Sequence, residues 1–313
     1  MPTLLDYRRR VRSVKNTQQI TRAMKFVAAA KLRRAQEGVF AARPYAREIL
    51  RVLRSAAARM ENISHPLLVR RGEDKILVLV VTGDRSLAGA FNSNVIRRAT
   101  EFMHEHSSKK LELMVVGKKA RDTFRKRGLN FVGEYLDVSA KVEFSKAKEI
   151  SAKIAELYIS CEVDAVYAVY NEFKNVMVQN LTVQKLLPID PEVVDREKKD
   201  GEKSLASHAG PDSSLPMERA PRGDEFLVDY IYEQPVDEIF KALMPRYLET
   251  EIFRLLLESA AAEHAARMTA MDAATRNASE LIDKLTLQMN KIRQAGITKE
   301  IIEIVSGAAS AMS

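Results

Sequence analysis

The chain has 313 residues, of which 46% are hydrophobic and 29% are charged. This globular composition excludes collagen, wholesale disorder and a disulfide scaffold, and the single cysteine, Cys161, favours a reducing compartment. No apolar run approaches the roughly 20 residues of a membrane-spanning helix. The net charge of +8 is uneven, since residues 1–59 carry 15 Lys/Arg against 3 Asp/Glu. Such basic segments bind nucleic acid, anionic lipid or acidic protein surfaces.

The N-terminal residues have the spacing of an amphipathic helix. Residues 3–37 contain neither glycine nor proline. Apolar side chains recur there at intervals of three and four, as at Leu4, Tyr7, Val11 and Val14. Arginines and lysines occupy the opposite face, as in a coiled coil. Gly38 and Pro44 are potential interruptions, after which the period resumes, and we expect residues 1–60 to form one helix of a coiled-coil shaft.

The middle of the chain alternates between strand and helix patterns. Continuous apolar runs at 76–81 and 111–116 are typical of strands buried on both faces. The alternation predicts an α/β domain with a parallel sheet over residues 74–232. Alternating polarity at 176–187 indicates an antiparallel partner. The other expected elements are strands at 129–133, 164–170 and 226–232, and helices at 93–104, 118–127 and 143–159.

The last part of the chain begins with a loop and continues as a helix. Residues 191–224 are rich in charged residues, Pro, Gly and Ser and predict a flexible loop. The helical pattern runs from 236 to about 307, and its glycine- and proline-free stretch at 246–295 would span roughly 75 Å. Because neither terminal helix can bury its stripe in so small a domain, we expect 236–313 to pair with the N-terminal helix. The predicted fold class is therefore α/β, with a small Rossmann-like domain inserted in a long antiparallel coiled coil.

The motifs yield no catalytic or metal-binding set. The loop at 82–94 follows a strand and opens a helix, as a phosphate cradle would. Five residues, rather than the four of a P-loop, separate Gly83 from Gly89, and no Lys-Ser/Thr pair follows. Cys161 is expected to be a small buried residue. Solvated side chains are expected for the five histidines, at positions 65, 104, 106, 208 and 264. We therefore expect no cofactor, no metal and no catalytic residue.

The basic face of residues 8–34 leaves several interpretations open. It could bind nucleic acid, although interleaved aromatic residues and a known DNA-reading pattern are missing. It could instead be a solvated coiled-coil face, or a basic shaft that lies against acidic surfaces of a surrounding complex. A small nucleotide-binding enzyme built on the α/β domain is a further alternative. Salt-dependent binding to random DNA would support the first interpretation, and specific nucleotide binding would support the last.

Three segments resemble one known family, the gamma subunit of F-type ATP synthases. They are RRRVRSVKNTQQITRAMKFVAAAKLRRAQ at 8–36, GDRSLAGAFNSNV at 83–95, and almost the whole helix at 242–310. The resemblance covers the chain apart from about 191–224, with the motifs in the family's order and spacing. It implies a central stalk subunit without chemistry of its own. Ion-driven rotation of a membrane c-ring turns this shaft inside a hexamer of alpha and beta subunits, which drives ATP synthesis; hydrolysis turns it in reverse.

The resemblance also implies contact residues on the shaft. Met24 matches the methionine that faces the levers of the beta subunits. Arg293 and Gln294 match the pair that contacts the catch region of beta, and Thr298 matches the nearby threonine. The apolar tip matches the part that turns in the bearing of the hexamer, and its members are Ile297, Ile301 and Val305.

A second implied contact region is the foot of the shaft. Tyr230, Tyr232 and Glu233 match residues near the epsilon subunit and the c-ring. The resemblance implies no nucleic-acid partner and no transmembrane segment in the chain itself. It implies a peripheral membrane protein on the cytoplasmic face of the bacterial plasma (inner) membrane, held there as part of the complex.

Overall fold

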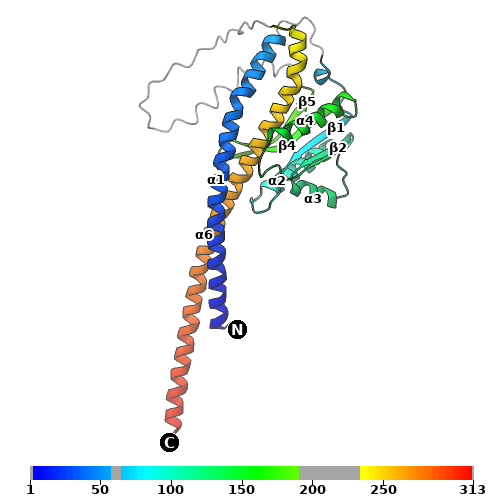
Figure 1. Ribbon diagram of the computed structural model, residues 1–313. Helices are drawn as coiled ribbons and strands as arrows, with labels where there is room; N and C mark the ends of the chain where they lie inside the picture. Colours follow the sequence, from blue (N-terminus) through cyan, green and yellow to red (C-terminus); the bar gives the residue numbers. More distant parts are fainter. Residues whose placement is uncertain (1–2, 58–64, 190–232, 312–313) are drawn as a thin grey trace, which may run out of the picture. The chain divides into compact units, whose positions relative to one another are not determined.

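The computed structural model describes residues 3–57, 65–189 and 233–311, which divide into two compact units (Figure 1). The first unit comprises Met1–Arg33, Leu87–Gly89 and Glu263–Ser313, and the second comprises Arg34–Ser86 and Ala90–Ala262. Two long helices contribute to both units, α1 at Leu4–Ala57 and α6 at Val236–Ala311. The remaining elements are η1 (Pro66–Leu68), β1 (Lys75–Val81), α2 (Phe91–Glu105), β2 (Lys110–Val116), α3 (Lys118–Lys126), β3 (Gly133–Tyr135), α4 (Phe144–Ile159), β4 (Ala165–Phe173) and β5 (Gln179–Leu187).

The second unit is built on a five-stranded sheet with the order β3-β2-β1-β4-β5. The strands β1 to β4 are parallel, and β5 pairs antiparallel with β4. Strands joined by helical crossovers and closed by one antiparallel edge strand form an α/β sheet. The predicted fold class, an α/β domain inserted between long N- and C-terminal helices, is confirmed.

The central strand β1 shows why this sheet needs continuous apolar runs. Successive side chains of a strand point to opposite faces. The side chains of Ile76, Val78 and Val80 pack with α2 and α3, whereas those of Leu77, Leu79 and Val81 pack with α4, α1 and α6. Because both faces are covered by helices, every position from Ile76 to Val81 is buried, and a polar residue there would lack a partner.

Helix α1 is continuous across the two residues that the sequence marked as potential interruptions. Pro44 lies inside the helix and is exposed, so its ring meets solvent rather than packed side chains. A proline in a helix interior costs about 3 kcal/mol. The flanking turns bury Val39, Ile49 and Leu53, and each such side chain contributes roughly 1.5–3 kcal/mol. Tertiary packing therefore outweighs the local helix breaker.

The third strand lies later than predicted, at Gly133–Tyr135 instead of 129–133. Its pairing with β2 begins where Met114 faces Gly133, and Gly117 then donates its N–H to the carbonyl of Tyr135 at 2.8 Å. The antiparallel partner and the helices lie within a few residues of the predicted bounds, and α6 continues to Ala311. The predicted loop at 191–224 and strand at 226–232 lie outside the described residues.

Gly117 and Gly128 provide a matched test of backbone geometry in the second unit. Both have positive φ, +93° and +76°. A Cβ at Gly117 would lie 2.1 Å from the carbonyl oxygen of Thr82, whereas nothing lies within 4 Å of one at Gly128. We expect Gly128→Ala to cost about 1–2 kcal/mol of conformational strain, and Gly117→Ala to cost about 3 kcal/mol or more. Urea midpoints of the two full-length variants measure the difference; equal losses would contradict the steric argument.

Candidate functional site

In the first unit, α1 and α6 run side by side and antiparallel (Figure 1). The C-terminal end of α6 extends beyond the N-terminal end of α1. The buried residues between the helices are small or slender, which lets the two backbones approach closely. They are Ala28 and Leu32 on α1, and Ala265, Met271, Ala278 and Leu285 on α6.

Three polar contacts join the two helices over consecutive turns. They are an amide–hydroxyl bond, a hydroxyl pair and an ion pair. As the residue number rises along α1, the number of its partner on α6 falls. This order is that of an antiparallel pair in a fixed register. We call these six residues the polar seam: Gln18 with Ser279 at 2.6 Å, Thr21 with Thr275 at 2.8 Å, and Lys25 with Asp272 at 2.5 Å.

The contact residues that the resemblance implies for the alpha/beta hexamer all lie in the first unit, but in two places. Met24 is half-buried on α1, beside the residue that binds Asp272. Arg293 and Gln294 are exposed on α6. They follow Asp272 by 21 and 22 positions, which is about 30 Å along the helix at 1.5 Å per residue. Thr298 is exposed and donates its hydroxyl to the carbonyl of Gln294 at 2.9 Å. The apolar tip is exposed as well, with 50% of Ile297, 54% of Ile301 and 63% of Val305 accessible.

The implied foot residues are only partly described. Glu233 is exposed and lies just before α6 begins. Tyr230 and Tyr232 lie outside the described residues. The structure therefore brings together the α6 contact residues, places Met24 apart from them, and gives no geometry for the two tyrosines.

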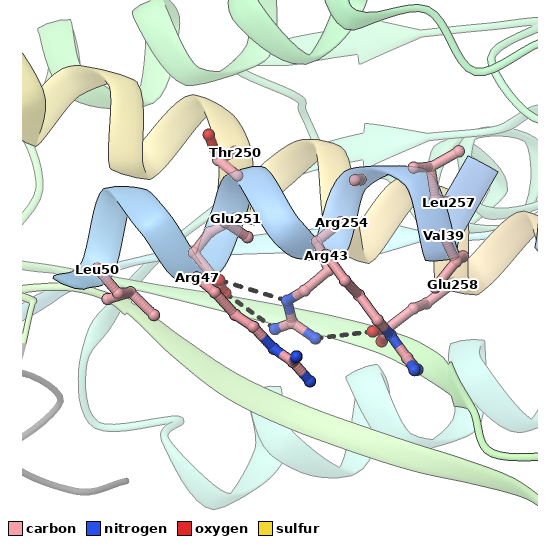
Figure 2. Close-up of a pocket in the computed structure, with 11 residues that line it drawn as sticks. Val39, Arg43, Arg47, Leu50, Thr250, Glu251, Arg254, Leu257 and Glu258 are labelled. Carbon is pink, nitrogen blue, oxygen red and sulfur yellow. Dashed lines mark hydrogen bonds and ion pairs between the residues drawn. The ribbon is translucent and has the colours of Figure 1, made fainter. Parts of the chain in front are cut away.

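The second unit contains a charged cluster at a groove of about 300 Å³ between α1 and α6 (Figure 2). Arg254 lies between two carboxylates and donates to Glu251 at 2.9 Å and to Glu258 at 2.9 Å. A further bond from Arg254 reaches Gln184 on β5 at 3.1 Å. On the facing side of the groove, Arg43 and Arg47 extend from α1. The cluster thus cross-links α6 to the sheet.

The electrostatics of this cluster favour one charged arginine. Burial acts to lower the pKa of Arg254, but the nearby carboxylates of Glu251 and Glu258 raise it above its ordinary value. Burial raises the pKa of Glu258, whose second carboxylate oxygen is buried without a hydrogen-bond partner among the described residues. Burial also raises the pKa of the neighbouring Tyr170 to about 12. These are the signs of a structural ion pair that is partly shielded from solvent.

The loop at 82–94 is held by its own polar side chains. The carboxylate of Asp84 accepts from the backbone N–H of Lys118 at 3.0 Å and of Asp137 at 3.1 Å, and from the hydroxyl of Ser139 at 3.0 Å. The side chain of Asn92 accepts from the N–H of Gly83 at 2.8 Å. These bonds tie the ends of β1 and β2 to the helices that follow them, so the polar side chains of the loop have a structural role.

The part of the chain that the structure describes contains neither a metal-binding cluster nor a membrane-spanning helix. Within the described residues, no group of three or more His, Cys, Asp and Glu side chains could hold a metal ion. Across the same residues, no helix combines the length and the apolar character needed to cross a membrane.

The expectations for the histidines and for Cys161 need correction. His65 and His264 are buried rather than solvated. His65 caps η1 by accepting from the N–H of Leu67 at 3.2 Å. Cys161 is exposed rather than buried, because it follows the end of α4 with φ of +61° and turns its side chain outward. A single His or Cys gives no periodic signal, so burial at these positions depends on tertiary packing.

His264 has a definite protonation state. Arg267 has only donors, so its contact with Nδ1 of His264 at 3.3 Å requires an unprotonated nitrogen there. Burial, with help from Arg267 and Lys31, lowers the pKa of His264 to about 4. The same arginine binds the buried carboxylate of Glu263 at 2.6 Å. The imidazole therefore stays neutral at physiological pH.

Sequence reasoning missed the polar seam and the Arg254 cluster. Gln18, Thr21 and Lys25 fall between apolar residues of the N-terminal stripe and were not assigned to the interior. Their spacing of three and four was the available signal. For Arg254, the signal was a pair of glutamates at i−3 and i+4, but such pairs are common on exposed helix faces.

The fold and the paired helices define a class of protein, a helical shaft that carries an α/β domain. A family model described as ATP synthase matches residues 3–311. The ATP synthase gamma chain of Solibacter usitatus (strain Ellin6076) is 50% identical over 315 residues, covering 99% of this chain and 100% of that relative. The gamma chain of Pelotomaculum thermopropionicum is 47% identical over 310 residues, covering 99% of each.

Solved structures with low sequence identity share the fold. A chain of the Euglena gracilis mitochondrial ATP synthase, from the structure of its OSCP, F1 and c-ring in rotational state 3, aligns with a TM-score of 0.61 at 20% identity. That alignment covers 99% of this chain and 94% of that chain. A chain of the Tetrahymena thermophila central stalk and c-ring aligns with a TM-score of 0.55 at 21% identity, covering 82% and 99%.

These matches settle the family. The chain belongs to the ATP synthase gamma-chain family. It is a subunit of a membrane-associated complex, and its role is that of a rotor component that couples rotation to ATP synthesis or hydrolysis.

Replacement of His264 should change how the stability of the protein depends on pH. The pKa of His264 is about 4 when folded and about 6.5 when unfolded, so the unfolded chain binds more protons between these values. Stability should therefore fall by about 1–3 kcal/mol as the pH drops from 6.5 towards 4. His264→Gln should flatten this part of the profile. Urea unfolding of both proteins at a series of pH values measures it, and identical slopes would contradict the buried neutral state.

Proposed function

We propose that this chain is a mechanical subunit without catalytic groups, which transmits torque between a rotating membrane ring and the catalytic head. The observation that carries the proposal is the paired-helix first unit, with polar cross-links inside and apolar and basic side chains outside. Such a surface suits enclosure by other subunits better than catalysis, which needs converging polar groups.

The exposed tip of α6 supports an enclosing partner. In addition to the three implied contact residues, Ile302 and Ile304 are exposed, the latter to 71%. Burial of apolar surface contributes about 25 cal/mol per Å². A sleeve around this part of α6 would therefore gain from every face of the helix. We propose that alpha and beta subunits form this sleeve, with Ile297, Ile301 and Val305 as contacts.

The polar contact residues extend this proposal. Arg293, Gln294 and Thr298 meet the catch region of beta, and Met24 meets its levers. Exposed basic residues near the start of α1, including Arg8 and Arg9, lie against acidic surfaces of the same hexamer. Family membership favours this assignment over nucleic-acid binding.

The foot of the shaft completes the partner list. Glu233, with Tyr230 and Tyr232, contacts the epsilon subunit or the c-ring. The complex lies on the cytoplasmic face of the bacterial plasma membrane, where this chain is a peripheral component. The relatives of highest identity named above come from bacteria, in keeping with that location.

The purified chain should neither bind ATP tightly nor hydrolyse it. The loop at 82–94 uses its polar groups for its own bonds, and the carboxylates of the Arg254 cluster are bound by that arginine. Equilibrium dialysis with ATP and a phosphate-release assay test this, with the assembled complex as the positive control. Turnover that stays with the chain after alpha and beta are removed would contradict a purely mechanical role.

Met24→Lys should impair coupling more than assembly. Lysine keeps helix propensity nearly unchanged, so α1 should still form. A new cation beside acidic levers would add an attraction of about 1–3 kcal/mol if partly desolvated, which deepens one rotational well. We expect fewer ions pumped per ATP hydrolysed in membrane vesicles that contain the variant complex.

Met24→Gln is the matched control, because it has a similar length and no charge. It should couple nearly as well as the original protein. Equal losses in the two variants would assign the effect to the lost methionine rather than to the new charge. Full coupling in Met24→Lys would remove Met24 from the proposed contact.

A further inference from the structure

The first unit has an unusual distribution of polarity. Thr21, 8% exposed, is the only buried residue of α1 between Leu4 and Val27 among the described residues. On the outside of the same stretch, large apolar side chains are more than half exposed. These are Ile20, Phe26 and Val27. Polar groups therefore occupy the interface between the helices where an ordinary coiled coil would place leucine or isoleucine.

The apolar neighbours of the polar seam are poor at specifying an alignment. The next buried side chains along the interface include Ala28 and Ala278. An alanine side chain makes few contacts and no directional ones, so these two positions do little to oppose a shift of one helix by a turn. Polar residues at interface positions are the best-attested means of fixing register, because a shifted alignment leaves them unpaired.

The geometry of the hydroxyl pair favours one alignment. Thr21 and Thr275 are 2.8 Å apart, and each is also within reach of a carbonyl of its own helix, of Gln18 at 3.0 Å and of Met271 at 2.7 Å. Each hydroxyl has one proton, so one hydroxyl donates across the interface while the other donates to its own helix. A shifted alignment would leave each hydroxyl donating to its own helix and would lose the hydrogen bond across the interface, which forms only when the two threonines are level.

The ion pair selects the same alignment by charge. Lys25 binds Asp272, which is also 3.4 Å from Arg276 on its own helix. If α1 slid by one turn along α6, Lys25 would no longer lie beside Asp272. The pair is about one-third exposed on each side, so its contribution is selective rather than strong.

We propose that the polar seam sets the register of the two shaft helices and so fixes the distance along the shaft between Met24 and the Arg293–Gln294 pair. This inference rests on the proposed function, in which both places contact the hexamer. The seam residues act through Met24, Arg293 and Gln294 rather than on the partners themselves, and are therefore positioning residues.

The test measures register directly in the assembled complex. Spin labels are attached to cysteines introduced at Ala30 and Lys284, which are exposed and lie about 25 Å apart along the shaft axis, so that sliding of one helix changes their distance directly. The background is Cys161→Ser, because the native cysteine is exposed and would also be labelled. Pulsed electron resonance should give one narrow distance distribution in this background.

Two sets of variants change the polar seam. Thr21→Val with Thr275→Val removes the hydroxyls and keeps the shape, which should leave thermal stability nearly unchanged. Lys25→Asp and Asp272→Lys each place like charges together, and the double variant restores an opposite pair. We expect a broadened distribution, or a second one displaced by about one turn (~5.4 Å), in the valine pair and in each charge variant. Ions pumped per ATP should fall at least two-fold in the same variants.

The charge swap separates register from general damage. The double variant should recover the narrow distribution and the original coupling, which a non-specific packing defect would not do. A single narrow, undisplaced distribution in the valine pair and in both single charge variants would overturn the inference. Failure of the proposed function would show differently, as full coupling in Met24→Lys with the register variants still displaced.

Discussion

Helices of 54 and 76 residues depend on cover for their apolar stripes, and pairing of α1 with α6 supplies it in the first unit. Isolated helices gain little from propensity alone, since most of their stability comes from packing one face. Here that face is narrow and lined by alanine, with Leu32 and Leu285 as the largest aliphatic members. Close approach of two helices compensates for small side chains, because dispersion contacts grow as the backbones come together. The polar seam fits in this interface for the same reason, since short hydroxyl and amide side chains reach across it.

The second unit solves the same problem with larger side chains and a sheet. There, α6 buries Ile252, Leu255 and Leu256 in the core that also holds α4 and one face of the strands. Arg254 lies on the same part of α6 and joins β5 through Gln184. One helix therefore changes its packing chemistry along its length, from bulky aliphatic contacts with a domain to slender contacts with a single helix. A rotor subunit needs both kinds of packing, because one part of the helix must be held by a domain and another must be narrow enough to be enclosed by partners.

Most of the fold follows from sequence patterns that repeat. The run Ile76–Val81 is typical of a strand buried on both faces, and the long stretch at 246–295 without glycine or proline favours one long helix. Gly38 and Pro44 were potential interruptions of the predicted N-terminal helix, and the burial of Val39, Ile49 and Leu53, which is a tertiary effect, keeps that helix continuous. The third strand was misplaced because three paired residues give no period. The polar seam was missed because a threonine at an interface position resembles a threonine on a surface until its partner, 254 positions away, is known.

The inverted polarity of the first unit has a physical consequence for rotation. Apolar side chains such as Phe26 and Val27 are stable in water only at a cost, so their exposure commits this surface to a partner. If these side chains lay inside the helix pair, the pair would be more stable alone and would offer the partner less. Hydrogen bonds inside the pair give alignment without using the apolar surface, because the bonds between the helices form only when their two partners are level. The outer surface of the helix pair therefore interacts with its partner through non-directional hydrophobic attraction, which prefers no single orientation. The directional hydrogen bonds lie between the two helices, where alignment must be kept.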